Sequence, residues 1–236
     1  MFRDLISQVV DYNGDLYRNI KGILESQALF DDLGNDLDQA VFIAAELLGK
    51  PASHAPGITR PFDYGTAVAY PFLQENWQAT RFSDGSRYGV WYGSEQLETT
   101  IHESVYHWLS FVQDAYPDEL DRAAGERRVF KVNCRGILIS LLGKEVEWPA
   151  LIDRGNYAFT QALGAYLVDQ NQNGVLTPSA RLEGAINAAI FRQEVLSNPR
   201  DVCYLTYRFI PATQTVQVLR NGAPCLEVPT DPGFFT

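Results

Sequence analysis

The sequence predicts an α+β fold with an N-terminal helical appendage, and three observations support this. First, residues 95–113 carry an apolar stripe at helical spacing, which predicts an amphipathic helix. The stripe consists of Leu97, Ile101, Val105, Trp108 and Val112. Second, two segments typical of strands, residues 202–210 and 215–219, flank a short turn and predict a hairpin. Third, the predicted strands and helices do not alternate as β-α-β units, which favours α+β over a doubly wound sheet.

The appendage is predicted over residues 1–55. Apolar residues recur at helical spacing from Phe2 to Tyr12, and a second helix is expected over residues 36–48, ended by Gly49. The stretch 49–65 is rich in proline and glycine and is typical of a loop or linker. We therefore place a boundary there, with the main domain over residues 56–236.

Within the main domain we expect strands over residues 88–93, 128–133 and 226–228. Two further helices are predicted. One covers residues 156–171 and ends before an Asn-Gly pair, and the other covers residues 184–195.

Composition excludes several classes of protein. The 236 residues carry a formal net charge of −10, and no cluster of basic residues offsets it, so nucleic acid is not expected as a direct partner. No apolar run reaches the ~18 residues of a membrane span, and the first residues lack a signal peptide pattern. We expect a cytoplasmic protein whose three widely spaced cysteines are reduced thiols.

No metal site is predicted. His102 and Glu103 begin like a zinc-protease motif, but the next histidine is His107, and residues five apart on a helix do not share a face. The sequence also lacks the glycine pattern of a dinucleotide-binding turn. No bound cofactor is expected.

The most informative segment covers residues 80–108. It brings an arginine, a strand ending in an aromatic residue and a helix with a glutamate into close succession. Glu103 lies opposite the apolar stripe of its helix, on a face shared with Thr99, Thr100 and His107. Periodicity alone favours a solvated helix face. The alternative is that this face lines a polar cleft.

The order of residues in this segment resembles the RES-domain family. The matching features are Arg81 followed by Phe82, a turn at residues 84–86, a strand ending at Tyr92, and Glu103 eleven residues later. The run from Gly174 to Arg181, which contains Ser179, is similar to the family's serine-bearing strand. The resemblance covers roughly residues 60–210.

The resemblance implies an ADP-ribosyltransferase-like core of two facing, mostly antiparallel sheets flanked by helices. It implies an enzyme that cleaves the nicotinamide–ribose bond of NAD, as a toxin neutralised by a partner antitoxin. NAD would be a substrate and not a cofactor. Water, phosphate or a protein side chain could accept the ADP-ribose, and a homodimer is left open. Two alternatives are an ADP-ribosyltransferase that uses the same site and a catalytically silent module that binds a partner.

The resemblance also suggests roles for residues. Glu103 is expected to stabilise the positive charge that develops on the ribose, and Arg81 to bind the pyrophosphate or a ribose hydroxyl. Tyr92 is expected to offer its ring to the nicotinamide cation. Ser179 is expected to donate a hydrogen bond to phosphate or ribose. Arg60 or Arg87 could hold part of the arginine role.

Overall fold

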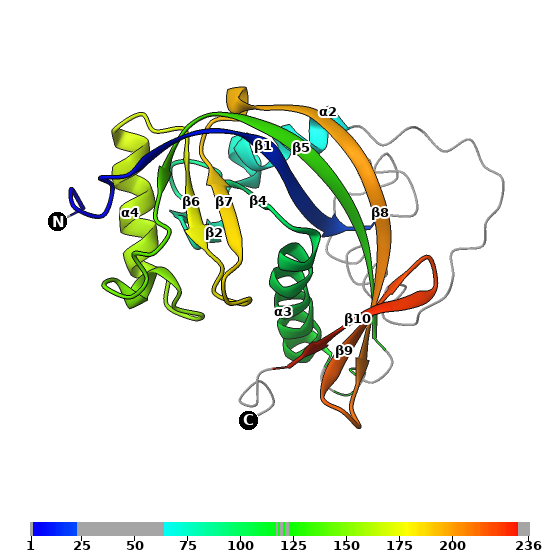
Figure 1. Cartoon of the computed structure of the whole chain (residues 1–236). Coiled ribbons are helices and arrows are strands. Elements are labelled where there is room, and N and C mark those ends of the chain that lie inside the picture. Colours follow the sequence, from blue (N-terminus) through cyan, green and yellow to red (C-terminus); the bar gives the residue numbers. More distant parts are fainter. Residues whose placement is uncertain (1, 23–63, 117, 119, 121–122, 231–236) are drawn as a thin grey trace. The chain divides into compact units, whose positions relative to one another are not determined.

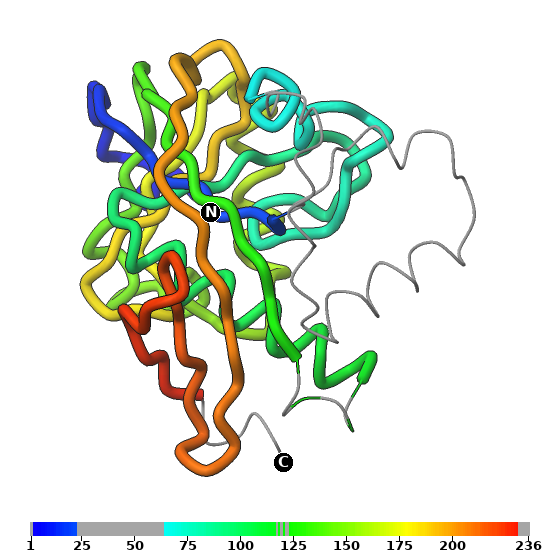
Figure 2. The backbone as a smooth tube through the Cα atoms, turned by 90° about the vertical axis from the view of Figure 1, so that its right-hand side faces the viewer, coloured from blue at the N-terminus to red at the C-terminus, as the bar shows by residue number. Residues whose placement is uncertain are grey.

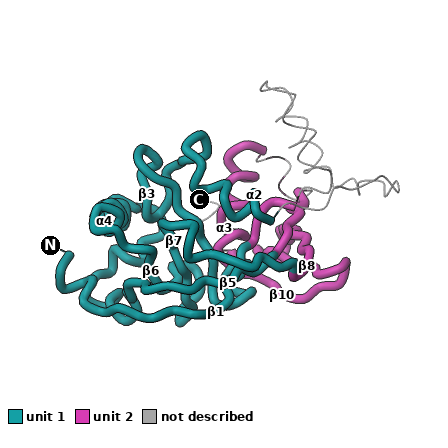
Figure 3. The backbone as a smooth tube through the Cα atoms, turned by 90° about the horizontal axis from the view of Figure 1, so that it is seen from above, with its two compact units in different colours: residues 1–18, 63–101, 130–201 teal, residues 19–62, 102–129, 202–236 magenta. Residues whose placement is uncertain are grey.

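The computed structural model describes residues 2–22, 64–116, 118, 120 and 123–230. The chain divides into two compact units, which Figure 3 colours separately. Unit 1 comprises residues 1–18, 63–101 and 130–201, and unit 2 comprises residues 19–62, 102–129 and 202–236. The predicted boundary near residue 55 and the helix predicted over residues 36–48 lie outside the described residues, so both stay predictions.

Within unit 1, five strands pair in the order β1, β4, β7, β6, β5. The pairs β1–β4, β4–β7 and β7–β6 are antiparallel, whereas β6 and β5 are parallel. Parallel neighbours need a long crossover, and here the crossover contains helix α4. The bounds of these elements are β1 Val9–Lys21, β4 Trp91–Ser94, α4 Ala158–Asp169, β6 Gly174–Pro178, β7 Ile186–Ile190 and β5 Ala124–Ser140.

Two helix predictions in unit 1 are wrong. Residues 9–21 form strand β1, not the first helix of an appendage. Polar side chains at Asp11, Asn13 and Asp15 alternate with Tyr12 and buried Leu16, which is the period-two pattern of a half-buried strand. Residues 184–195 contain strand β7 and a single 3-10 turn (Gln193–Val195) where a helix was predicted. Their strand conformation is decided by pairing with β4 and β6.

Helix α4 confirms the helix predicted over residues 156–171, and it packs on strands β6 and β7 (Figure 1). Its buried Leu163 and Leu167 join Val175 of β6 and Ala189 of β7 in one apolar cluster. Because this core lies between α4 and the sheet, the helix covers one face of strands β6 and β7, next to the candidate site.

Unit 1 also contains short elements before β4. They are α2 Tyr64–Ala69, the 3-10 turns Tyr70–Phe72 and Gln74–Asn76, and the paired two-residue strands β2 Ala79–Thr80 and β3 Ser83–Asp84. A further 3-10 turn, Pro149–Leu151, precedes α4. The β2–β3 turn carries Arg81, the first residue of the predicted site.

Unit 2 contains most of helix α3 and a three-stranded meander, drawn in orange and red in Figure 2. Helix α3 (Leu97–Ala115) confirms the predicted amphipathic helix, and its stripe residues Val105, Trp108 and Val112 are buried. The predicted hairpin is present as β8 (Leu196–Ile210) and β9 (Thr215–Arg220), which pair antiparallel. Strand β10 (Ala223–Pro229) follows and pairs with β9.

The α+β class is confirmed, because helices and mostly antiparallel strands occur together in the described residues. The three cysteines form no disulfide; Cys134 and Cys203 are buried and Cys225 is exposed. No helix in the described residues is long and apolar enough to cross a membrane.

Candidate active site

Arg81 lies at the tip of the β2–β3 turn, and its side chain reaches the loop that precedes α4. Its Nη1 donates to the carbonyl oxygens of Leu151 (3.2 Å) and Asp153 (2.8 Å). The guanidinium carbon lies 4.7 Å from the centre of the Tyr157 ring, within the range of a cation–π contact. The same loop therefore fixes both the position and the plane of the guanidinium.

Most of the donor capacity of Arg81 remains unused. Among the residues that the structure describes, only Nη1 donates a hydrogen bond, which leaves the N–H groups of Nε and Nη2 without an acceptor. A guanidinium presents its donors in a planar fork that matches the oxygen atoms of phosphate or carboxylate. This geometry suits Arg81 to an anionic ligand.

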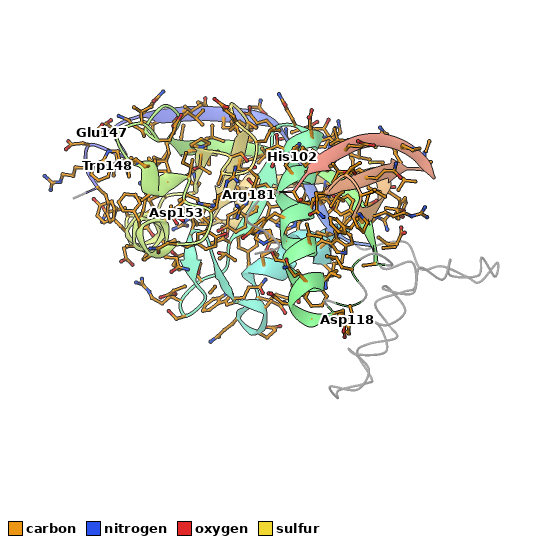
Figure 4. The ribbon with its side chains drawn as sticks, turned by 90° about the horizontal axis from the view of Figure 1, so that it is seen from below. His102, Asp118, Glu147, Trp148, Asp153 and Arg181 are labelled. Carbon is orange, nitrogen blue, oxygen red and sulfur yellow. The ribbon has the colours of Figure 1, made fainter. Side chains whose placement is uncertain are left out.

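Two more arginines meet the same loop. Arg181 Nη2 donates to the carbonyl of Arg154 (2.7 Å), and Arg154 Nε donates to the carbonyl of Ala180 (3.0 Å). Figure 4 labels Asp153 and Arg181 in this part of unit 1. The pKa of the Asp153 carboxyl is lowered, first by hydrogen bonds from the backbone N–H groups of Asn156 and Gly155 and then by the charges of Arg81 and Arg181. Arg81 and Arg181 are thus both close enough to act on one carboxylate.

Ser179 shapes the turn that carries Arg181. Its buried hydroxyl oxygen accepts the backbone N–H groups of Arg181 and Leu182, each at 3.1 Å. This is the pattern by which a serine side chain stabilises a turn. The structure therefore brings Ser179 to the arginine loop, where it holds Arg181. Its expected contact with phosphate or ribose stays a prediction.

Tyr92 connects strand β4 to the turn of Arg81. Its hydroxyl donates a hydrogen bond to Thr80 Oγ1 (2.9 Å) and accepts one from the backbone N–H of Phe82 (2.9 Å). Tyr92 therefore binds the turn on both sides of Arg81. Its ring packs against the apolar cluster beneath α4. Burial raises the pKa of the Tyr92 hydroxyl to about 12, and the two hydrogen bonds partly oppose the rise. Stacking of this ring on nicotinamide stays a prediction.

Arg18, in strand β1, was not predicted as a site residue. Its Nη1 donates to the Tyr92 carbonyl (3.1 Å), and its guanidinium lies 5.2 Å from the centre of the Trp91 ring. Its Nε is shielded from solvent and, among the described residues, donates to no acceptor. Burial lowers the pKa of Arg18 to about 10. A shielded cation of this kind is costly unless a ligand or partner satisfies it, so Arg18 is a second candidate for binding an anion.

The alternation of residues 9–21 could have revealed Arg18. It places Arg18 on the same face of the strand as Tyr12 and buried Leu16, so a strand assignment would have predicted its cation on a covered face. The helix assigned to these residues hid this signal.

Glu103, the predicted catalytic acid, belongs to unit 2 and is half-buried on α3. The next residue, Ser104, shares a 2.8 Å hydrogen bond with the hydroxyl of buried Tyr207, which also accepts one from Asn19 Nδ2 (2.7 Å). The Trp108 ring packs edge-on against the Tyr207 ring. These contacts hold the part of α3 that carries Glu103 against Tyr207. The convergence of Glu103 with Arg81 and Tyr92 stays a prediction.

The remaining predicted arginines are not brought to this cluster by any described contact. Arg87 forms an exposed ion pair with Asp169 at the end of α4, and that pair raises the pKa of Arg87. Arg60 lies outside the described residues. No group of three or more histidine, cysteine, aspartate or glutamate side chains gathers in a metal-binding arrangement within the described part of the chain.

Comparison with known proteins assigns the chain to a family. The family model of the RES domain matches residues 51–210, which is more than half of the 236-residue chain. The chain belongs to the RES-domain family. The RES match contains Arg81, Tyr92, Glu103 and Ser179, whereas Arg18 lies ahead of it.

One solved structure that resembles this RES protein is the crystal structure of the M. tuberculosis MbcT-MbcA toxin-antitoxin complex. The likeness has a TM-score of 0.45 at 14% sequence identity and covers 85% of this chain and 92% of that chain. A search of curated proteins finds no match.

Proposed function

We propose that this RES-domain protein cleaves the nicotinamide–ribose bond of NAD. The observation that carries the proposal is the Arg81 guanidinium, held by one nitrogen and with two nitrogens still able to donate. NAD presents a matching pyrophosphate, whose negative oxygens accept paired N–H donors. Arg18 supplies a second cation in the same unit, with a shielded Nε that lacks an acceptor among the described residues.

The proposed reaction divides the work between binding and charge stabilisation. The bond between C1′ of the ribose and the nicotinamide nitrogen breaks, and its electron pair leaves with nicotinamide. Nicotinamide departs as a neutral base, so this step needs no acid. The ribose becomes positive and oxocarbenium-like, and the Glu103 carboxylate stabilises that charge. Water then adds to C1′ and gives up one proton. Phosphate in place of water would make the reaction a phosphorolysis.

The test follows NAD and nicotinamide by proton NMR with the purified chain, with and without phosphate. Loss of a preorganised electrostatic contact costs ~10²–10³ in rate, so Glu103→Gln should consume NAD at least about 100-fold more slowly than the natural chain. Circular dichroism checks that the variant folds. Glu98→Gln is a matched control, because Glu98 is an exposed acid in the first turn of the same helix, and its rate should be unchanged.

Three outcomes would revise the proposal. Full activity in Glu103→Gln removes Glu103 from the mechanism. Transfer of labelled ADP-ribose to a protein, with no ADP-ribose released, would make the chain an ADP-ribosyltransferase. If the natural chain neither consumes NAD nor gains thermal stability from it, the chain is a binding module instead.

We also propose that the chain acts as the toxin of a toxin–antitoxin pair. Membership of the RES family supports this role, and the net charge of −10 suits a partner with a basic face. Induced expression of the chain should arrest bacterial growth as cellular NAD falls, and Glu103→Gln should relieve both effects together. Growth arrest at unchanged NAD would refute the link.

A further inference from the structure

Side chains hold four backbone groups of the turn that carries Arg81. Gln161 Nε2 donates to the carbonyl oxygens of Thr80 (2.9 Å) and Ser83 (3.3 Å). The Phe82 N–H donates to the Tyr92 hydroxyl, and the Phe82 carbonyl accepts from the Tyr88 hydroxyl (2.7 Å). A two-residue β ladder with a short turn has little stability of its own. These side chains therefore determine its conformation.

Gln161 makes the contacts that span Arg81. Its single amide nitrogen bonds one carbonyl before Arg81 and one after it, so the turn cannot open without loss of one bond. An ionised carboxylate does not suit this position, because it only accepts hydrogen bonds and would face two carbonyl oxygens.

One stretch of the chain contacts both the guanidinium of Arg81 and the backbone of the turn that carries it. Leu151 and Asp153 accept from it, Tyr157 lies under it, and Gln161 follows one helical turn after Tyr157. Every described hydrogen bond of the Arg81 side chain, and its cation–π contact, thus come from residues 151–157. The segment from residue 151 to Gln161 therefore positions both the guanidinium and the backbone of Arg81.

Gly164, one turn beyond Gln161 on α4, allows the close approach. A Cβ at residue 164 would lie 2.1 Å from the Phe82 carbonyl oxygen, which is far inside van der Waals contact. Only glycine lets the helix lie against the turn backbone at this distance, and this distance also lets the Gln161 amide reach both carbonyls.

We propose that Gln161 is a positioning residue for Arg81: its amide fixes the turn so that Nε and Nη2 of Arg81 meet the anionic group of the substrate. The inference rests on the proposed function, in which that group is the pyrophosphate of NAD. Gln161 itself touches no substrate. Its effect should appear in substrate affinity and not in the bond-breaking step.

Two variants test this in the full-length chain. Gln161→Leu keeps the size and removes the donors, so KM for NAD should rise about 10-fold while kcat changes less than about twofold. Gln161→Glu should have a raised KM at pH 8 that recovers toward the natural value near pH 4, because a carboxyl of ordinary pKa ~4.3 is then mostly protonated and can again donate one hydrogen bond. A residue with a purely structural role would not give that pH-dependent KM. Gln170→Leu is the matched control, since Gln170 is exposed just after the same helix.

Hydrogen exchange gives a readout that does not depend on activity. The Phe82 amide should exchange at least about 10-fold faster in Gln161→Leu than in the natural chain, while amides of the β8–β9 hairpin keep their protection. An unchanged KM for NAD together with unchanged Phe82 exchange in Gln161→Leu overturns the inference and leaves the proposed function intact.

A second arm separates the two proposals. If the natural chain does not consume NAD, the proposed function fails, and titration with inorganic pyrophosphate then decides the role of Gln161. Binding about 10-fold weaker in Gln161→Leu than in the natural chain supports the inference. Equal affinity, or no binding by either protein, overturns it.

Discussion

Gly164→Ala tests the close approach of α4 to the Arg81 turn, because two physical effects predict opposite changes in the free energy of unfolding. Helix propensity alone favours alanine over glycine by ~1 kcal/mol. The new methyl would, however, lie 2.1 Å from the Phe82 carbonyl oxygen and 2.9 Å from the Tyr88 hydroxyl. Backbone cannot move aside as a flexible side chain can, so helix and turn must separate by about 1 Å, and overpacking of this kind costs up to ~3 kcal/mol.

The net expectation is a loss of about 2 kcal/mol in the free energy of unfolding, since the overpacking exceeds the gain in propensity. For a chain of this size that lowers Tm by about 4–8 °C. KM for NAD should rise as well, because the turn that moves carries Arg81. Differential scanning calorimetry measures the first effect and steady-state NAD consumption the second.

Ala162→Gly is the matched control, because Ala162 is exposed two residues earlier on the same helix. It should lose only the propensity term, ~1 kcal/mol, and leave KM unchanged. A Tm for Gly164→Ala above that of the natural chain would refute the reasoning, since helix propensity would then outweigh any steric conflict.

The remaining predictions concern other side chains of the site and its supports. In the slow Glu103→Gln background, isothermal titration calorimetry should show that Arg18→Met weakens NAD binding by roughly 10–150-fold, the worth of a charged hydrogen bond, whereas Arg87→Ala, which removes an exposed ion pair, leaves binding unchanged. Tyr207→Phe should cost about 2 kcal/mol in urea unfolding, because the hydroxyl of this buried side chain loses two hydrogen bonds, while Tyr204→Phe at an exposed position should cost nothing measurable. Because folding raises the Tyr92 pKa from its ordinary value of 10 to about 12, the folded state holds the proton more tightly, so stability should fall as pH rises from 10 to 12. Tyr92→Phe should make that fall shallower by up to ~1.4 kcal/mol per pH unit, and an identical slope would refute the assignment.

Local patterns predicted the elements whose periodicity is strong. The stripe of α3 and the β8–β9 hairpin follow from the spacing of their own residues, and the order of Arg81, Tyr92 and Glu103 was enough to indicate the family. The wrong assignments fall where the pattern is short or mixed. Strand β1 has apolar residues that fit both a helical and an alternating period. Strand β7 is a short, mostly apolar segment that becomes a strand by pairing with its neighbours.

The amino-acid sequence by itself determined the α+β class, the two main helices, the family and the arginine, tyrosine and glutamate expected at the site. Only the tertiary structure decided what those side chains contact. The Tyr92 hydroxyl bonds the Arg81 turn, and Ser179 supports the turn of Arg181. Arg18 and Gln161 join the site from segments that are distant in sequence. The physical reason is that periodicity reports which face of an element is covered. Hydrogen-bond partners depend on which elements pack together, and residues 80 and 161 show no relation until α4 lies against the turn.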